Sequence, residues 1–137
     1  MLFRSMAKHN KLGQRGEEIA KKYLEDKGYT ILETNWRYGH WEIDIIAKRY
    51  DFLSIVEVKT RSTNYFGYPE SFVGKKKMQN LINATDEYMR QNSMDALGVR
   101  FEIVAITVSD NGFEVEHIEE AFNPTDTLDL SSPYDSY

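Results

Sequence analysis

The chain has 137 residues, enough for one domain with a hydrophobic core of its own. It contains no Cys, which excludes disulfides and thiolate metal sites, so any metal would bind through oxygen or His ligands. Its net charge of −5 argues against a uniformly basic surface. No apolar run approaches the ~20 residues of a membrane span, and the first residues are too polar for a signal peptide. We therefore expect a single-domain cytoplasmic protein with no membrane partner.

The charges are segregated along the chain. Residues 1–117 hold equal numbers of basic and acidic residues, whereas the residues from Ile118 onward include acids but no Lys or Arg. Before Glu17 the charged residues are all basic. We predict a flexible basic N-terminal arm at residues 1–10 and a folded domain at 11–122. Residues 123–137, which are poor in large apolar residues, are predicted to form a disordered acidic tail.

The first predicted element is a helix from about residue 11 to 27, capped by Asn10 and ended by Gly28. Glu17 lies at the edge of its apolar stripe. It is either a solvated acid that the helix dipole favours or a residue of a site, and its position alone does not decide between them. The stripe consists of Leu12, Gly16, Ile19, Ala20, Tyr23 and Leu24.

Three strands are predicted next, at 29–36, 41–49 and 52–61, with turns at 37–40 and at Tyr50-Asp51. The third is rich in β-formers and apolar on both faces, as expected for a central strand. The second alternates, with Trp41, Ile43, Ile45 and Ala47 on one face and Glu42, Asp44, Ile46 and Lys48 on the other.

A loop at 62–74 precedes a long helix at about 75–92, a strand at 101–108 and, after the hairpin signal Asp110-Asn111-Gly112, a strand at 113–118. The order is helix, three strands, helix, two strands. This order predicts an α/β fold in which a mixed sheet carries helices on both faces.

A two-residue turn at Tyr50-Asp51 would place Asp44 opposite Glu57 and Glu42 opposite Lys59, whereas a three-residue loop would break this register. Opposite Cβ atoms lie about 5 Å apart, where two carboxylates repel by roughly 3 kcal/mol at an effective dielectric near 20. A shared proton, a nearby Lys or Arg, or a divalent cation would relieve this repulsion. Alternatively, Glu42 and Lys59 form an ordinary ion pair while Asp44 and Glu57 reach solvent.

Basic residues suggest where an anion would bind. Lys75, Lys76 and Lys77 stand at a helix N-terminus, where cations are unfavourable unless a phosphate accompanies them. Arg37, Arg61 and the basic arm would extend this surface, although a solvated Lys run is an equally good interpretation. No base-reading motif is present, and His9, His40 and His117 are too dispersed to assign to a site.

Asp44, followed after twelve residues by Glu57-Val58-Lys59, resembles the PD-(D/E)XK nuclease superfamily. More narrowly, the chain resembles the YraN-like bacterial family, predicted endonucleases distantly similar to archaeal Holliday junction resolvases. The resemblance covers about Lys8 to Phe122. It rests on Gly13-x-x-Gly16-Glu17-x-x-Ala20, Gly28-Tyr29-x-Ile31-Leu32-x-x-Asn35-x-Arg37, Glu42-Ile43-Asp44-Ile45-Ile46-Ala47, Val56-Glu57-Val58-Lys59-Thr60-Arg61, Phe66-Gly67-x-Pro69, Lys77, and Arg100-Phe101-Glu102-Ile103-Val104.

The resemblance implies a restriction-endonuclease-like αβββαβ core and a catalytic site of Glu17, Asp44, Glu57 and Lys59. Asp44 and Glu57 would bind Mg²⁺, with Mn²⁺ as a substitute, and Glu17 would belong to the same metal site by binding metal-coordinated water or a second ion. Lys59 would orient or deprotonate the attacking water. Glu42 is a weaker candidate for the same site.

The sequence departs from the family pattern at two positions of this segment. Trp41 replaces the usual Gly, and Ile43 stands where the superfamily name has Pro. We expect Trp41 to point away from the acids and to change packing rather than chemistry.

The expected function is hydrolysis of phosphodiester bonds in DNA, including branched or repair and recombination intermediates. Two alternatives stay open. The chain could be a non-catalytic nucleic-acid-binding accessory protein with a nuclease-like fold, or an interaction domain whose acids are structural. By analogy with resolvase-like proteins, a homodimer is expected.

Overall fold

The computed structural model describes residues 2–62, 74–94 and 98–122, so the predicted acidic tail and most of the 62–74 loop lie outside the described residues. No helix among the described residues is long and apolar enough to cross a membrane. The elements are α1 (Leu2–Asp26), β1 (Thr30–Tyr38), β2 (Trp41–Arg49), β3 (Phe52–Ser62), α2 (Lys75–Gln91), β4 (Gly98–Ser109) and β5 (Gly112–Phe122).

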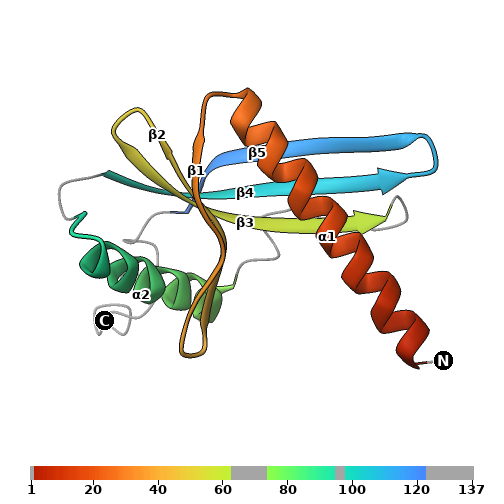
Figure 1. Cartoon of the computed structure of the whole chain (residues 1–137), viewed down its shortest axis with the longest axis horizontal. Helices are drawn as coiled ribbons and strands as arrows, with labels where there is room; N and C mark the ends of the chain where they lie inside the picture. The colour runs from red at the N-terminus through yellow and green to blue at the C-terminus, as the bar shows by residue number, and fades with distance from the viewer. Residues whose placement is uncertain (1, 63–73, 95–97, 123–137) are drawn as a thin grey trace, which may run out of the picture.

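The five strands form one mixed sheet in the order β1-β2-β3-β4-β5. All neighbours are antiparallel except β3 and β4, which are parallel and are connected through α2. The two helices cover opposite faces (Figure 1). The predicted αβββαβ core is therefore confirmed, with β5 added to its edge. The α2 face is packed by Ile43, Ile46, Leu53, Ile55, Leu81, Ala84, Tyr88, Phe101, Ile103 and Phe122, and the α1 face by Ala20, Leu24, Tyr29, Ile45, Ala47, Val56, Val104 and Ile106.

Helix α1 begins at Leu2, so the prediction that Asn10 caps it is wrong. Residues 2–11 contain no Gly or Pro to end the helix, and it continues through the predicted arm and projects beyond the sheet (Figure 1). The predicted C-terminus is confirmed. Gly28 has φ +94°, and the amides of Gly28 and Tyr29 donate to the carbonyls of Glu25 and Leu24, each at 3.0 Å, as in a Schellman motif.

The turn between β2 and β3 fixes their register as predicted. Arg49 pairs with Phe52, and the ladder continues to Ile45 and Val56, where it ends. Beyond that pair, β2 stays bonded to β1 as far as Trp41 and leaves β3 (Figure 1). We call this separation of β2 from β3 the fork. The predicted ladder pairs Asp44–Glu57 and Glu42–Lys59 are therefore wrong, because both positions lie past the end of the ladder.

The fork also breaks the predicted alternation of β2. Trp41 and Ile43 pack on the α2 side, whereas Ile45 and Ala47 pack on the α1 side, so these four residues do not share a face. The change of face falls at Asp44. On β1 the neighbouring pairs are Thr34–Ile45 and Trp36–Ile43, and between them Asn35 has φ +51°. A left-handed residue in β1 thus accompanies the twist that separates the hairpin from β3.

Candidate functional site

A polar cavity of about 290 Å³ lies at the fork and is formed by α1, β2, β3 and α2. All four predicted catalytic residues line it, together with the weaker candidate Glu42. The sequence-based expectation that these residues gather in one place is therefore matched by the geometry. Among the described residues, the lining consists of Leu12, Gly13, Glu17, Glu42, Asp44, Glu57, Val58, Lys59, Thr60 and Lys77.

The Asp44 side chain takes the place of a β2 backbone partner for β3, just beyond the last ladder pair. Its Oδ2 accepts a hydrogen bond of 2.8 Å from the backbone N–H of Val58 on β3. Its carboxyl lies close enough to that of Glu57 for the two groups to affect each other's pKa. Burial raises the pKa of Asp44 to about 9, with contributions from the hydrogen bond and charge of Glu57 and from the charge of Glu17, against the opposing Val58 amide. We therefore expect Asp44 to hold a proton at pH 7 in this arrangement.

Glu57 is buried, with 5 % of its surface exposed, and it carries the negative charge of the pair. Burial alone would raise its pKa, but the hydrogen bond with Asp44 and the ammonium group of Lys77 outweigh burial and hold the pKa below its ordinary value. Lys77 Nζ lies 2.9 Å from Glu57 Oε2. Of the three arrangements expected to relieve carboxylate repulsion, a nearby Lys is present, and the raised pKa of Asp44 agrees with a shared proton.

Glu17 reaches the cavity because α1 packs unusually close to β3. Gly16 is buried, and a Cβ at this position would lie 1.7 Å from Thr60 Oγ1, so only glycine permits the approach. Asn35 Nδ2 donates to Glu17 Oε2 at 3.2 Å. Glu17 is partly buried and its charge acts on Asp44. It therefore belongs to the site and is not merely a solvated acid of the helix.

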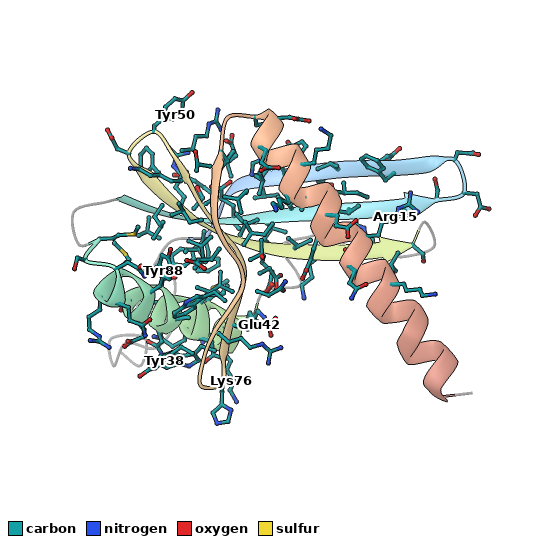
Figure 2. All side chains as sticks on the ribbon, viewed as in Figure 1. Arg15, Tyr38, Glu42, Tyr50, Lys76 and Tyr88 are labelled. Atoms are coloured by element: carbon teal, nitrogen blue, oxygen red, sulfur yellow. The ribbon has the colours of Figure 1, made fainter. Side chains whose placement is uncertain are left out.

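The predicted nucleic-acid-binding residues divide into two groups. Lys77 lines the cavity, whereas Arg37, Arg61, Lys75 and Lys76 are not among the described residues that line it. Arg37 forms a 3.2 Å ion pair with Glu42, its partner across the β1–β2 ladder, and Arg61 Nε donates to Thr107 Oγ1 at 3.1 Å. Lys76 is exposed at the surface (Figure 2). Of these five residues, Lys77 is the one that the described part of the structure places in the cavity, in contact with Glu57.

The oxygen atoms at the fork fit a hard divalent cation with two protein carboxylates. Among residues 2–62, 74–94 and 98–122 no group of three His, Cys, Asp or Glu side chains gathers closely enough to hold a metal. Asp44 and Glu57 nevertheless supply the one or two carboxylates that Mg²⁺ usually takes, with water completing the shell. Glu57 Oε2 is buried and receives no well-directed hydrogen bond from the described residues, because its ion pair with Lys77 is close but poorly aligned. The predicted role of Glu17 is consistent only with an indirect contact through water.

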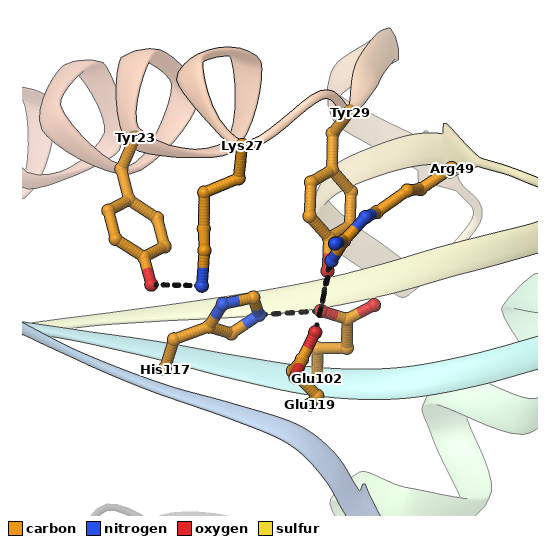
Figure 3. Close-up of polar contacts among 7 residues, drawn as sticks. All are labelled: Tyr23, Lys27, Tyr29, Arg49, Glu102, His117 and Glu119. Atoms are coloured by element: carbon orange, nitrogen blue, oxygen red, sulfur yellow. Dashed lines mark hydrogen bonds and ion pairs between the residues drawn. The ribbon is translucent and has the colours of Figure 1, made fainter.

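A second buried polar cluster, which was not predicted from the sequence, lies on the α1 side of the sheet (Figure 3). Glu102 on β4 is 2 % exposed; its Oε1 lies 2.6 Å from His117 Nε2 and accepts a 2.9 Å hydrogen bond from the Tyr29 hydroxyl. Arg49 reaches the same hydroxyl and pairs with Glu119 at 3.1 Å. Burial raises the pKa of Tyr29, which therefore stays a donor. The only signal in the sequence was a Glu inside an apolar strand, which needs a partner but does not identify it.

Comparison with known proteins gives the family. The model described as "Uncharacterised protein family UPF0102" matches residues 16–106, which include all four predicted catalytic residues. A UPF0102 protein of Flavobacterium psychrophilum is 49% identical over 117 residues, covering 85% of this chain and 98% of that protein. One from Phocaeicola vulgatus is 48% identical over 119 residues, covering 87% of this chain and 98% of its own length. The chain belongs to the UPF0102 family.

Proposed function

We propose that this protein is a metal-dependent endonuclease that hydrolyses phosphodiester bonds in DNA, with Mg²⁺ or Mn²⁺ as its cofactor. The observation that carries the proposal is the polar cavity at the fork, whose lining brings together Asp44, Glu57, Lys59 and Glu17. If these acids had no role, we would expect their side chains to be exposed to solvent. Here they face each other where β2 and β3 separate.

Each side chain has a role that follows from its position. Asp44 and Glu57 would hold the cation, which when bound polarises a phosphate oxygen and lowers the pKa of a coordinated water. Lys59, two residues beyond Glu57 on β3, lines the same cavity and would orient the attacking water and stabilise negative charge that develops on the phosphate. Glu17 would fix a second water from the α1 side. The Val58 amide holds the Asp44 carboxyl in place.

DNA binding would rely on backbone contacts. Lys75, Lys76 and Lys77 lie in the first turn of α2, whose N-cap Gly74 supplies no side-chain cap, so the backbone amides of this turn are available to a phosphate beside the exposed Lys76. Arg37 and Arg61 would extend this surface. Such contacts position a nucleic acid without reading its sequence, which favours recognition of structure, as in branched or repair intermediates.

The test is cleavage of branched, duplex and single-stranded DNA by the full chain with Mg²⁺ or Mn²⁺. We expect the wild type to cut at least one substrate, and Asp44→Asn and Lys59→Met to abolish cutting while DNA binding persists. Asp86→Asn and Lys48→Met, which change the same types of side chain at exposed positions outside the cavity, are the matched controls. Both control variants should still cut DNA in the presence of the same metal.

The outcomes separate the proposal from its alternatives. Binding of DNA without cleavage, at high protein concentration and with either metal, would support the non-catalytic accessory protein. That alternative has one observation in its favour: Lys77 already neutralises Glu57 without a metal. Failure to bind both DNA and metal would leave the acids as a structural feature of an interaction domain.

A further inference from the structure

Lys77 differs from its two neighbours in where its ammonium group lies. It is the third residue of α2, and its Nζ contacts Glu57 Oε2 at 2.9 Å, inside the cavity at the fork. Successive residues on a helix differ in direction by about 100°, so Lys76 projects elsewhere and is exposed (Figure 2). Of this pair of adjacent lysines, only Lys77 is in position to act on the carboxylates.

The contact neutralises a charge that water cannot reach. The Glu57 side chain is only 6 % exposed, and burying an uncompensated carboxylate is costly. The 2.9 Å ion pair places the ammonium group of Lys77 against this carboxylate. Lys77 therefore balances the buried charge of Glu57 as long as no other cation is present.

The same contact stands in the way of a divalent cation. The oxygen that Lys77 holds, Glu57 Oε2, is the buried carboxylate oxygen that has no well-directed hydrogen bond among the described residues. A cation bound to that oxygen would lie next to the ammonium group and repel it. The Lys77 side chain is 42 % exposed and flexible, so it can leave Glu57 without unfolding α2.

We propose that Lys77 is an internal counter-ion that occupies Glu57 until a divalent cation displaces it, and that the released ammonium group then holds a phosphate of the substrate. This inference rests on the proposed function, because it assumes that the carboxylates of the fork bind metal. It assigns Lys77 a positioning role toward metal and substrate in place of a general contribution to DNA affinity. It also explains how the acid cluster is stable when no metal is bound.

The first test is Mn²⁺ affinity, measured on the full chain by isothermal titration calorimetry without DNA. A divalent cation about 5 Å from an ammonium group in a water-like dielectric loses affinity by roughly tenfold. Lys77→Met should therefore bind Mn²⁺ roughly tenfold more tightly than the wild type. Lys76→Met removes the same charge from the adjacent residue outside the cavity and should change the affinity by less than about twofold.

The second test needs no variant. The side-chain ammonium signal of Lys77, followed by NMR in ¹⁵N-labelled protein, should be that of an ion-paired group without metal and should shift on addition of Mg²⁺. The Lys76 signal should not shift. This measurement keeps the inference testable even if Lys77→Met folds poorly.

The results distinguish failure of the inference from failure of the proposed function. If the wild type and Lys77→Met both fail to bind Mn²⁺ at millimolar concentration, both ideas are wrong. If the wild type binds Mn²⁺ but a folded Lys77→Met binds it equally or more weakly, the counter-ion role is wrong and the metal site stands. An unshifted Lys77 signal in a metal-saturated protein would overturn the inference in the same way.

Discussion

Replacing Asp44 by Asn should make the metal-free protein more stable while it removes a metal ligand. Asn has nearly the same shape as a neutral Asp, and its Oδ1 can still accept the hydrogen bond from the Val58 amide. The substitution removes an ionisable carboxyl group whose burial beside Glu57 and Glu17 destabilises the folded protein. Asp44→Asn therefore tests directly whether the acids of the fork are held together at the expense of stability.

The sign and size of this change in unfolding free energy follow from the raised pKa of Asp44. The pKa of Asp44 rises from the ordinary 3.8 to about 9, so above pH 4 the folded protein binds a proton that the unfolded chain does not. Wild-type stability then falls by up to about 1.4 kcal/mol for each pH unit as pH rises from about 5 to 8. Because Asp44 is partly exposed and coupled to Glu57, we expect about 2–4 kcal/mol of stabilisation in Asp44→Asn at pH 7.

The assay is urea unfolding of the wild type and Asp44→Asn at pH 5, 6, 7 and 8, without metal. The difference in unfolding free energy should grow steadily with pH, and it should be small for Asp86→Asn, whose side chain is exposed on α2. A difference that stays constant over this range would show that Asp44 is ionised in the folded protein. In that case the shared proton between Asp44 and Glu57 is wrong.

Three further predictions concern packing. Gly16→Ala should lower the unfolding free energy, measured in urea, by about 1–3 kcal/mol, because the added Cβ has no room. Gly13→Ala, whose Cβ would have nothing within 4 Å, should raise the unfolding free energy by up to about 1 kcal/mol. Equal effects of the two substitutions would contradict the close approach of α1 to β3. Asn35→Ala should be about 1 kcal/mol less stable than Asn35→Gly because φ is +51°, and the reverse order would rule out backbone strain. Glu102→Ala should cost about 3–5 kcal/mol by the same measurement, with Mn²⁺ affinity unchanged, whereas exposed Glu114→Ala should cost little.

Local patterns were enough to predict most of the fold. Gly28 ends α1, and the Tyr50-Asp51 turn fixes the β2–β3 register, because both depend on a few adjacent residues. The same register predicted that Asp44 and Glu57 lie together. The predicted pairing is wrong beyond Ile45, where β2 leaves β3, because no local pattern in the sequence marks the end of the ladder. The carboxyls still meet, because Asp44 replaces the lost strand partner of Val58 by bonding its amide.

Long-range contacts account for what the sequence did not reveal. Three consecutive lysines begin α2, and no local pattern identifies Lys77 as the one that reaches Glu57, because that depends on how α2 is rotated against the sheet. His117 and Glu102 are likewise brought together only when β5 pairs with β4. The helix start was misplaced for a simpler reason: Asn10 is a good cap residue but also tolerates a helix interior when nothing before it stops the helix.

The central claim, that Asp44 and Glu57 form a metal site, is tested most directly by crystallising the full chain with Mn²⁺ and measuring anomalous scattering at the manganese edge. We expect one strong peak at the fork, within coordination distance of both carboxylates, and Lys77 no longer in contact with Glu57. A crystal saturated with Mn²⁺ that shows no peak there, with Lys77 still paired to Glu57 as it is now, would contradict the claim.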